Sequence, residues 1–235
     1  MARVQPLFAS TREYCRAYLT EDAPDMFIEV TTDDLAYEQE MAEKEAIEEG
    51  LRVRRFSDPF LERATIQRKI AVELLNRDTI LFHGSTVGVD GCAYLFTAPC
   101  GTGKSTHTRY WCEVFSPRAV MVNDDKPFLR ITPSGVFAYG SPWSGKHGLA
   151  TNICLPLKGI CFLSRGSENL IHRATPEESL PELLHQSFIP EDHGIREKAV
   201  ELVHELSRRV PLWQMECTKD LSAAYVSYEA MSAER

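Results

Sequence analysis

The sequence predicts an α/β fold, with α+β character, in which helices flank a mixed sheet rich in hairpins. Three observations support this expectation. A β-rich run leads through a glycine-rich loop into a helical segment between residues 92 and 114. Turn residues separate short β-rich runs on both sides of that segment, which predicts antiparallel strands beside it. Further along the chain, stretches with helical apolar spacing alternate with strand-like apolar runs.

Length and composition bound the class of protein. The 235 residues can bury one substantial core, so we expect a single domain over residues 1–235, with a looser leading part at 1–60. The sequence contains no long apolar run, so we expect neither a membrane span nor a signal peptide. Seven cysteines without a CxxC pair favour reduced thiols and a cytoplasmic protein. The net charge of −8, without basic stripes, argues against nucleic-acid binding.

Two helices are expected before the sheet. Residues 21–49 hold twelve acidic side chains and one Lys, and the stretch 35–50 predicts a solvated helix that ends at Gly50. A partner-binding or lid role is the alternative for this acidic segment. Apolar residues recur at helical spacing over 61–76, which predicts an amphipathic helix that leads to the sheet.

The sheet is expected to begin with two β-rich runs in residues 79–98, separated by the turn dipeptide Asp90-Gly91. Later, Thr175 and Glu178 have capping-box spacing, so they mark the start of a helix. The remaining expected elements are helices at 104–114, 175–188, 195–206 and 221–231, strands at 118–122, 157–163 and 210–217, and a hairpin formed by 126–131 and 136–140.

The glycine-rich loop fits the pattern GxxxxGK[ST] except at its first position, Ala98. Glycines let backbone N–H groups converge on phosphate oxygens, and the helix start adds a positive dipole end. Lys104 can reach the β- and γ-phosphates, while Ser105 can ligate Mg²⁺; a chance match is the alternative. The expected nucleotide-binding residues are Ala98, Pro99, Cys100, Gly101, Thr102, Gly103, Lys104, Ser105 and Thr106.

A carboxylate pair, Asp124 and Asp125, follows the strand after the loop helix. Two carboxylates permit two roles, because one can hold Mg²⁺ while the other accepts a proton from an attacking hydroxyl. Adjacent residues on an extended strand point to opposite faces, so a bend just after Asn123 must bring the pair together. A solvated turn before Lys126 is the alternative.

Two basic residues complete the candidate site. Lys146 lies in the Gly-, Ser- and Pro-rich stretch 139–149, which could bring a cation to the transferring phosphoryl group or could be a plain connection. His83 lies near the end of the strand before the hairpin, where it could share a sheet edge with the loop or be satisfied structurally.

Four stretches, "LFHGSTV", "LFTAPCGTGKSTHTRYW", "VNDDKPFL" and "YGSPWSGK", resemble in their order and spacing the HPr kinase/phosphorylase and phosphoenolpyruvate carboxykinase superfamily, and most closely its small HPr-kinase-like members. The resemblance covers about residues 80–165. It implies a phosphate-loop kinase core with ATP and Mg²⁺. It also implies nucleotide and metal binding by Lys104 and Ser105, metal and proton handling by the Asp pair, and a family histidine at His83.

This chain also departs from the HPr kinases. Thr106 stands where they usually have an acidic residue, and an Arg-Gly-Leu-Gly segment linked to dephosphorylation of HPr is missing from the sequence. HPr recognition and the reverse phosphorylase reaction therefore stay open. Within the carboxylate pair, we expect Asp124 to be the base and Asp125 the metal ligand, and the reverse assignment stays open.

These residues predict an ATP-dependent phosphotransferase that moves the γ-phosphoryl group to a hydroxyl with Mg²⁺. The acceptor stays open between a serine of a peptide or protein and a small alcohol, and self-association stays open too. Neither a nucleic acid nor a membrane is an expected partner. The alternative is a nucleotide-binding regulatory module that switches a protein partner without transferring phosphate. The expected catalytic residues are Asp124, Lys104, Lys146 and His83.

Overall fold

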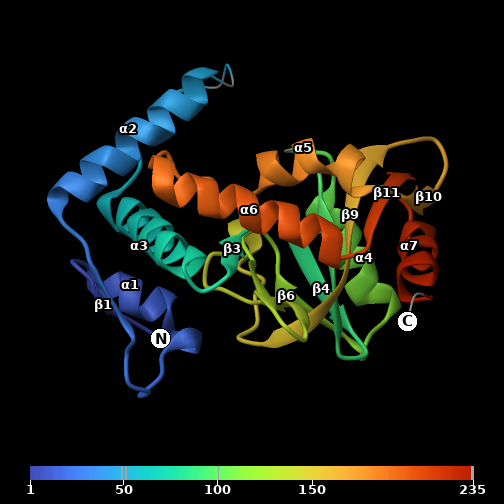
Figure 1. Ribbon diagram of the computed structural model, residues 1–235, viewed down its shortest axis with the longest axis horizontal. Helices are drawn as coiled ribbons and strands as arrows, with labels where there is room; N and C mark the ends of the chain where they lie inside the picture. The colour runs from blue at the N-terminus through green and yellow to red at the C-terminus, as the bar shows by residue number, and fades with distance from the viewer. Residues whose placement is uncertain (49, 51, 100, 234–235) are drawn as a thin grey trace. The chain divides into compact units, whose positions relative to one another are not determined.

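A computed structural model describes residues 1–48, 50, 52–99 and 101–233 (Figure 1). The chain divides into two compact units, Met1–Glu73 and Leu74–Arg235. The expectation of a single domain stays a prediction, because two compact units can belong to one domain. None of the described helices combines the length and the apolar character that a membrane crossing requires.

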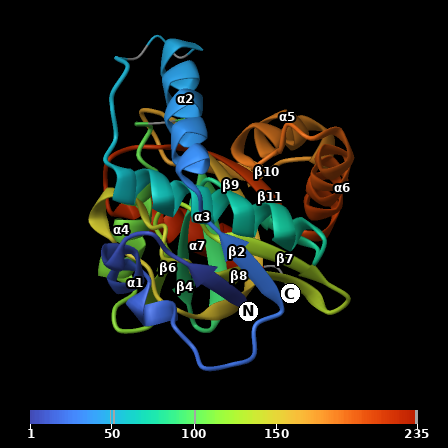
Figure 2. The same cartoon turned by 90° about the vertical axis from the view of Figure 1, so that its left-hand side faces the viewer.

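The first unit contains a short parallel two-stranded sheet and several helices (Figure 2). Glu62, which is fully buried, accepts hydrogen bonds from the backbone N–H groups of Leu7 and Phe8 and from the hydroxyl of Thr11, so it anchors the N-terminal segment. The elements of this unit are β1 (Ala2–Gln5), α1 (Ala9–Tyr14), η1 (Arg16–Tyr18), β2 (Met26–Glu29), α2 (Thr32–Glu48) and most of α3 (Asp58–Leu75).

Helix α2 is the expected acidic helix, and most of its side chains are exposed. One edge is tied to α3, because Asp34 lies 2.7 Å from the ammonium of Lys69 and Glu38 pairs with Arg68. Helix α3 confirms the amphipathic helix expected at 61–76 and begins three residues earlier, at Asp58.

The second unit contains the mixed sheet and its flanking helices. Its strands are β3 (Thr79–Leu81), β4 (Ser85–Val89), β5 (Cys92–Thr97), β6 (Ala119–Asn123), β7 (Phe128–Thr132), β8 (Gly135–Tyr139), β9 (Cys154–Arg165), β10 (Leu170–Arg173) and β11 (Leu212–Cys217). Its helices are α4 (Lys104–Val114), η2 (Gly145–His147), α5 (Pro176–Gln186), α6 (His193–Arg209) and α7 (Ser222–Ser232).

The described strands of this unit form one sheet in the order β3-β7-β8-β9-β5-β4-β6, with β11 beside β9 and β10 beside β11. Strand β9 pairs in parallel with β5 and β11, whereas the hairpin pairs β4–β5 and β7–β8 are antiparallel. The α/β fold with a mixed, hairpin-rich sheet is therefore confirmed. The turn between β4 and β5 has positive φ at Asp90 (51°) and Gly91 (80°), as its sequence predicts.

One prediction within this sheet is wrong. The run 79–89 was expected to be continuous, but it forms two strands, because β3 pairs with β7 while β4 pairs with β5 and β6. The chain changes partner at His83 and Gly84, whose N–H groups donate to the carbonyls of Gln186 and Asp125. Gly84 also lies so close to Leu95 that an added Cβ would be 2.9 Å from its side chain.

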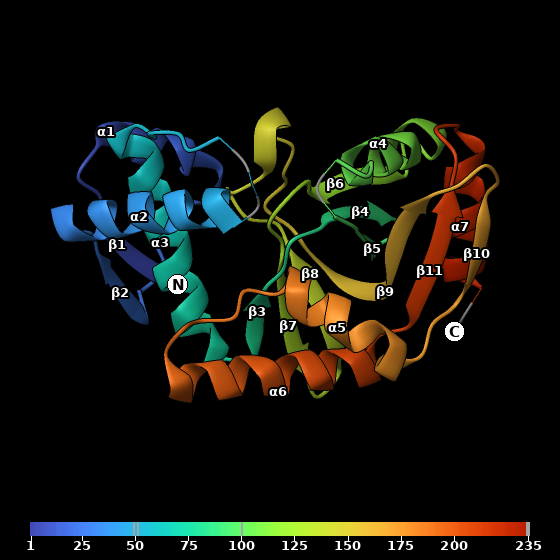
Figure 3. The same cartoon turned by 90° about the horizontal axis from the view of Figure 1, so that it is seen from above.

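Two apolar clusters cover the two faces of this sheet. One cluster contains residues of α5 and α6 and includes Phe82, Leu95 and Leu202. The other contains residues of α4 and α7 and includes Phe96 and Trp111. Figure 3 shows α5 and α6 on one side of the sheet and α4 on the other. The loop between β5 and α4 is thus held by a strand and a helix that are both packed in the core.

Candidate active site

The loop between β5 and α4 has the backbone of a phosphate cradle. Gly101 and Gly103 have φ angles of 77° and 129°, which L side chains rarely adopt, and no atom lies within 4 Å of where their Cβ atoms would be. Lys104 begins α4, and its ammonium donates a 2.8 Å hydrogen bond to the carbonyl of Ala98. The lysine side chain therefore folds back to the start of the loop.

A cavity of about 410 Å³ adjoins this loop. Four separate segments contribute to it: the turn between β3 and β4, the loop with the start of α4, the residues that follow β6, and the connection between β8 and β9. The sequence-predicted residues His83, Lys104, Asp124 and Asp125 all lie on this cavity. Its full lining is His83, Gly101, Gly103, Lys104, Ser105, Thr106, Asp124, Asp125, Gly145 and His147.

The bend that the carboxylate pair requires is present at the end of β6. The side-chain oxygen of Asn123 accepts hydrogen bonds from the backbone N–H groups of Asp125 (2.8 Å) and Lys126 (2.6 Å). Side-chain acceptors of this kind replace the strand's ladder partners and turn the chain. Asp124 and Asp125 therefore line the same cavity although they are adjacent in the sequence.

Asp124 is buried, with 4% of its surface exposed. Its Oδ1 accepts a 2.8 Å hydrogen bond from the hydroxyl of Ser85, which also lies 2.7 Å from the hydroxyl of Thr108. Because the Ser85 proton goes to Asp124, the Thr108 hydroxyl is the donor in its contact with Ser85, and its oxygen lies 3.3 Å from the carbonyl oxygen of Lys104. This chain of hydroxyls fixes the Asp124 carboxylate relative to the first turn of α4.

Asp125 is more accessible, and its Oδ1 lies 3.5 Å from Nε2 of His83. Burial raises the pKa of Asp125, but the hydrogen bond with His83 and the charges of Lys126, His83 and Lys104 outweigh burial, so the net pKa is lowered. The carboxylate therefore stays ionised near neutral pH. Gly145, with φ of +67°, lies so close that an added Cβ would be 3.1 Å from the Cβ of Asp125.

The connection between β8 and β9 is fastened to the end of β6. The amide of Asn123 donates to the backbone carbonyl and the hydroxyl of Ser141, both at 3.0 Å. Asp124 N–H donates to the carbonyl of Leu149 at 3.0 Å. Gly140 has no room for a side chain, because an added Cβ would be 1.9 Å from the carbonyl oxygen of Thr151. These contacts hold the 140–151 connection at the carboxylate pair.

Not every predicted residue is placed on this cavity. Ala98 and Pro99 line a neighbouring pocket, and the N–H of Thr102 donates to the carbonyl of Pro99 at 3.3 Å. Cys100 lies outside the described residues. Lys146 belongs to η2, but its side chain is not among those described, so its contact with the phosphoryl group stays a prediction.

Several residues of the site were missed in the sequence. Ser85 and Thr108 orient Asp124, and Arg165 at the end of β9 donates a 2.6 Å hydrogen bond to the carbonyl of Gly101 in the loop. A serine in a strand and a threonine in a helix carry no motif, and Arg165 is 64 residues from Gly101 in the chain. These contacts arise from the packing of β4, β9 and α4, which local sequence signals do not encode.

Comparisons with known proteins give limited information about this site. No family model and no curated protein matches the chain. Among solved structures, the chain is similar to the HPr(Ser) kinase/phosphatase from Coxiella burnetii at 11% identity and a TM-score of 0.39, over 65% of this chain and 92% of that chain. A similarity this low does not establish a family. The fold and the cavity define an α/β protein in which a glycine-rich loop, a lysine and two carboxylates share one site.

Proposed function

We propose that this protein is an ATP-dependent phosphotransferase that moves the γ-phosphoryl group of ATP to a hydroxyl, either a serine of a peptide or protein or a small alcohol. One observation carries the proposal: Lys104 and both members of the Asp124-Asp125 pair line a single cavity beside a glycine-rich loop. A phosphate cradle alone would suit any nucleotide-binding module. A carboxylate pair at the same cavity supplies the additional groups that transfer requires.

In this proposal the loop and Lys104 bind the phosphate chain. Backbone N–H groups of the loop and the N-terminus of α4 provide hydrogen-bond donors and partial positive charge for phosphate oxygens. The ammonium of Lys104 exchanges its hydrogen bond with the Ala98 carbonyl for the β- and γ-phosphate oxygens. Its charge then offsets the negative charge that grows on the leaving phosphate during transfer.

Ser105 and Asp125 are the residues proposed to hold Mg²⁺. Their hydroxyl and carboxylate oxygens are the hard ligands that Mg²⁺ prefers, and both line the cavity. The lowered pKa of Asp125 supports this role, because it keeps the carboxylate ionised for a cation and makes it a weaker base. When bound, Mg²⁺ would neutralise charge on the β- and γ-phosphate oxygens.

Asp124 is the proposed proton acceptor. The acceptor hydroxyl gives its proton to the carboxylate of Asp124 as its oxygen forms a bond to the γ-phosphorus. The bond between the γ-phosphorus and the bridging oxygen breaks, and ADP leaves with the electron pair. The hydrogen bond from Ser85 orients the Asp124 carboxylate for this transfer. His83 is proposed to position Asp125 through their 3.5 Å contact.

The proposal is tested by incubating the full chain with γ-labelled ATP, Mg²⁺ and a cell extract, then separating labelled products by size. We expect the wild type to form a labelled product, and we expect the amount of this product to fall in Lys104→Ala and in Asp124→Asn. The exposed Asp33→Asn variant is the matched control and should give the wild-type amount of product. If the wild type and Asp124→Asn give the same products, the phosphotransferase proposal is wrong and the regulatory module becomes the better hypothesis.

A further inference from the structure

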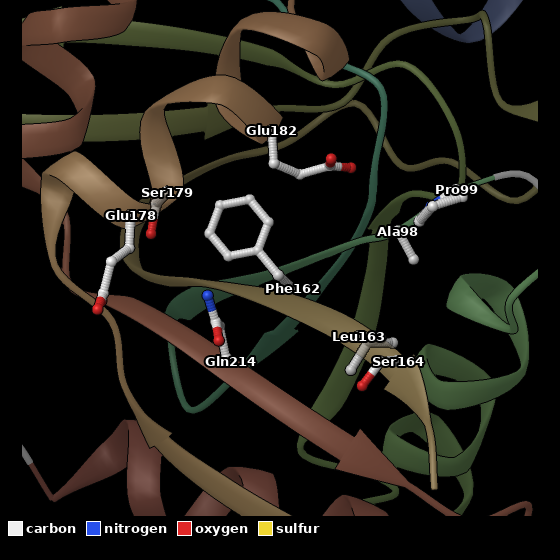
Figure 4. Close-up of a pocket in the computed structure, with 9 residues that line it drawn as sticks. All are labelled: Ala98, Pro99, Phe162, Leu163, Ser164, Glu178, Ser179, Glu182 and Gln214. Carbon is white, nitrogen blue, oxygen red and sulfur yellow. The ribbon is translucent and has the colours of Figure 1, made fainter.

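A second pocket, of about 280 Å³, opens beside the start of the phosphate loop. Figure 4 shows that it is formed by the loop residues Ala98 and Pro99, by strands β9 and β11, and by helix α5. This volume is below the roughly 300–1,000 Å³ typical of sites that enclose a whole drug-sized ligand. The pocket therefore suits one part of a larger ligand, such as a single ring system.

The lining of this pocket combines an aromatic ring with hydrogen-bonding groups. Phe162 is half-buried, and Figure 4 shows the amide nitrogen of Gln214 directed toward its ring. The carboxylate of Glu182 extends from α5 toward Ala98 and Pro99 (Figure 4), and one of its oxygens accepts a 2.9 Å hydrogen bond from Gln186.

One polar group at this pocket is unsatisfied. Ser179 is 1% exposed, and within the described part of the chain its hydroxyl has no hydrogen-bond partner. Figure 4 shows Ser179 on α5 beside the ring of Phe162. A buried hydroxyl without a partner lowers stability, so such a group marks a site where a ligand or a water completes the hydrogen bonds.

The order of the strands places this pocket on the side of the loop opposite the carboxylates. Strand β5 enters the loop, with β4 and then β6, which ends at Asn123, on one side of it. On its other side lies β9, followed by β11, which carry Phe162 and Gln214. A triphosphate whose terminal phosphate faces Asp124 therefore has its other end directed toward β9 and β11.

We propose that this second pocket binds the purine base of the nucleotide whose phosphates occupy the loop. This inference rests on the proposed function and extends it to the nucleoside half of the same ligand. The Phe162 ring stacks against the base, as aromatic side chains do with nucleobases. The Gln214 amide offers both a donor and an acceptor to the base edge, and the Glu182 carboxylate accepts from an exocyclic amino group.

The proposal is tested by titrating the full chain with ATP and with inorganic tripolyphosphate, each with Mg²⁺. Tripolyphosphate carries the phosphates without a base. We expect the wild type to bind ATP at least about 10-fold more tightly than tripolyphosphate. Phe162→Leu keeps an apolar side chain against the core but removes the ring. It should weaken ATP binding by about 5-fold or more. A 5-fold change corresponds to about 1 kcal/mol, which is the lower end of the roughly 1–3 kcal/mol attributed to base stacking.

The matched control is Phe137→Leu, the same substitution at a half-buried position on β8 away from both pockets. Gln214→Leu is another variant of the proposed base pocket. It should also weaken ATP binding while leaving the affinity for tripolyphosphate unchanged. Equal affinity of the wild type for the two ligands, or an unchanged ATP affinity in both pocket variants, overturns the base pocket while leaving the phosphate site intact. If instead Lys104→Ala binds both ligands as tightly as the wild type does, the proposed phosphate site is wrong and the proposed base pocket is wrong with it.

Discussion

We predict that a buried histidine in α4 makes the stability of the second unit depend on pH. His107 lies one turn into α4 and is 3% exposed. Its Nε2 is 3.0 Å from the hydroxyl of Ser227 on α7, and the Trp111 indole also donates to it at 3.3 Å. The ring packs on Phe96, with 4.5 Å between ring centroids. These contacts join the phosphate-loop helix to α7.

Burial lowers the pKa of His107 from 6.5 to about 4. The unfolded chain takes up this proton near pH 6.5, whereas the folded chain takes it up only near pH 4. The contribution of neutral His107 to the free energy of unfolding is therefore fully present above pH 6.5 and is lost as the pH falls from 6.5 to 4. A difference of about 2.5 pKa units at about 1.36 kcal/mol each amounts to about 3 kcal/mol. Replacing His107 with Gln removes this loss while keeping a side chain that can hydrogen-bond to Ser227.

The assay is urea unfolding at several pH values between 7.5 and 4, followed by tryptophan fluorescence. All three tryptophans, Trp111, Trp143 and Trp213, lie in the second unit, so the signal reports on that unit. We expect the free energy of unfolding of the wild type to fall by about 3 kcal/mol more than that of His107→Gln. The exposed His193→Gln is the matched control and should follow the wild type. If the free energies of unfolding of the wild type and His107→Gln differ by the same amount at every pH, the protonation of His107 does not control the pH dependence.

Four further predictions concern the candidate active site. Lys104→Ala should weaken ATP binding by about 10-fold or more, because it removes a charged hydrogen-bond donor from the phosphates; unchanged affinity and turnover in a titration and a transfer assay would rule out the phosphate loop. Asp124→Asn should slow transfer by about 100-fold or more with Mg-ATP affinity nearly intact, whereas Asp125→Asn should raise the Mg²⁺ concentration needed for turnover; the opposite pattern would exchange their roles. Lys146→Met should lower turnover without lowering the melting temperature, and a loss of stability alone would remove it from the mechanism. Gly145→Ala should lower the free energy of unfolding by about 1 kcal/mol and reduce turnover, because the added Cβ contacts the Asp125 side chain and alanine is strained at a φ of +67°. Wild-type turnover of this variant would contradict the contact with Asp125.

The parts of the fold that depend on local physics could be predicted from the sequence. Helix α4 has the predicted bounds, Lys104–Val114, because the loop motif that precedes it marks where the helix begins. The Asp90-Gly91 turn follows from the positive φ that these two residues tolerate. The capping box of Thr175 and Glu178 is present on both sides, with each side chain bonded to the other's backbone N–H.

Contacts that depend on packing between distant segments could not be predicted. Strand β3 leaves the expected run because its partner is β7, which lies about 50 residues further along the chain. Strands β1, β2 and β10 are too short to carry a clear apolar alternation. The bend after Asn123 could be anticipated only as a requirement, since the sequence does not show that its side chain would accept two backbone hydrogen bonds.

The proposed phosphotransfer is tested most directly by an experimental structure of the full chain with Mg²⁺ and a non-transferable ATP analogue. We predict that the γ-phosphate lies within hydrogen-bond distance of the Lys104 ammonium, about 2.7–3.1 Å, and that Asp124 faces it across an open cleft that admits an acceptor hydroxyl. An analogue bound away from the loop, or a γ-phosphate closed off by a partner-sized apolar patch with Asp124 directed elsewhere, would contradict it.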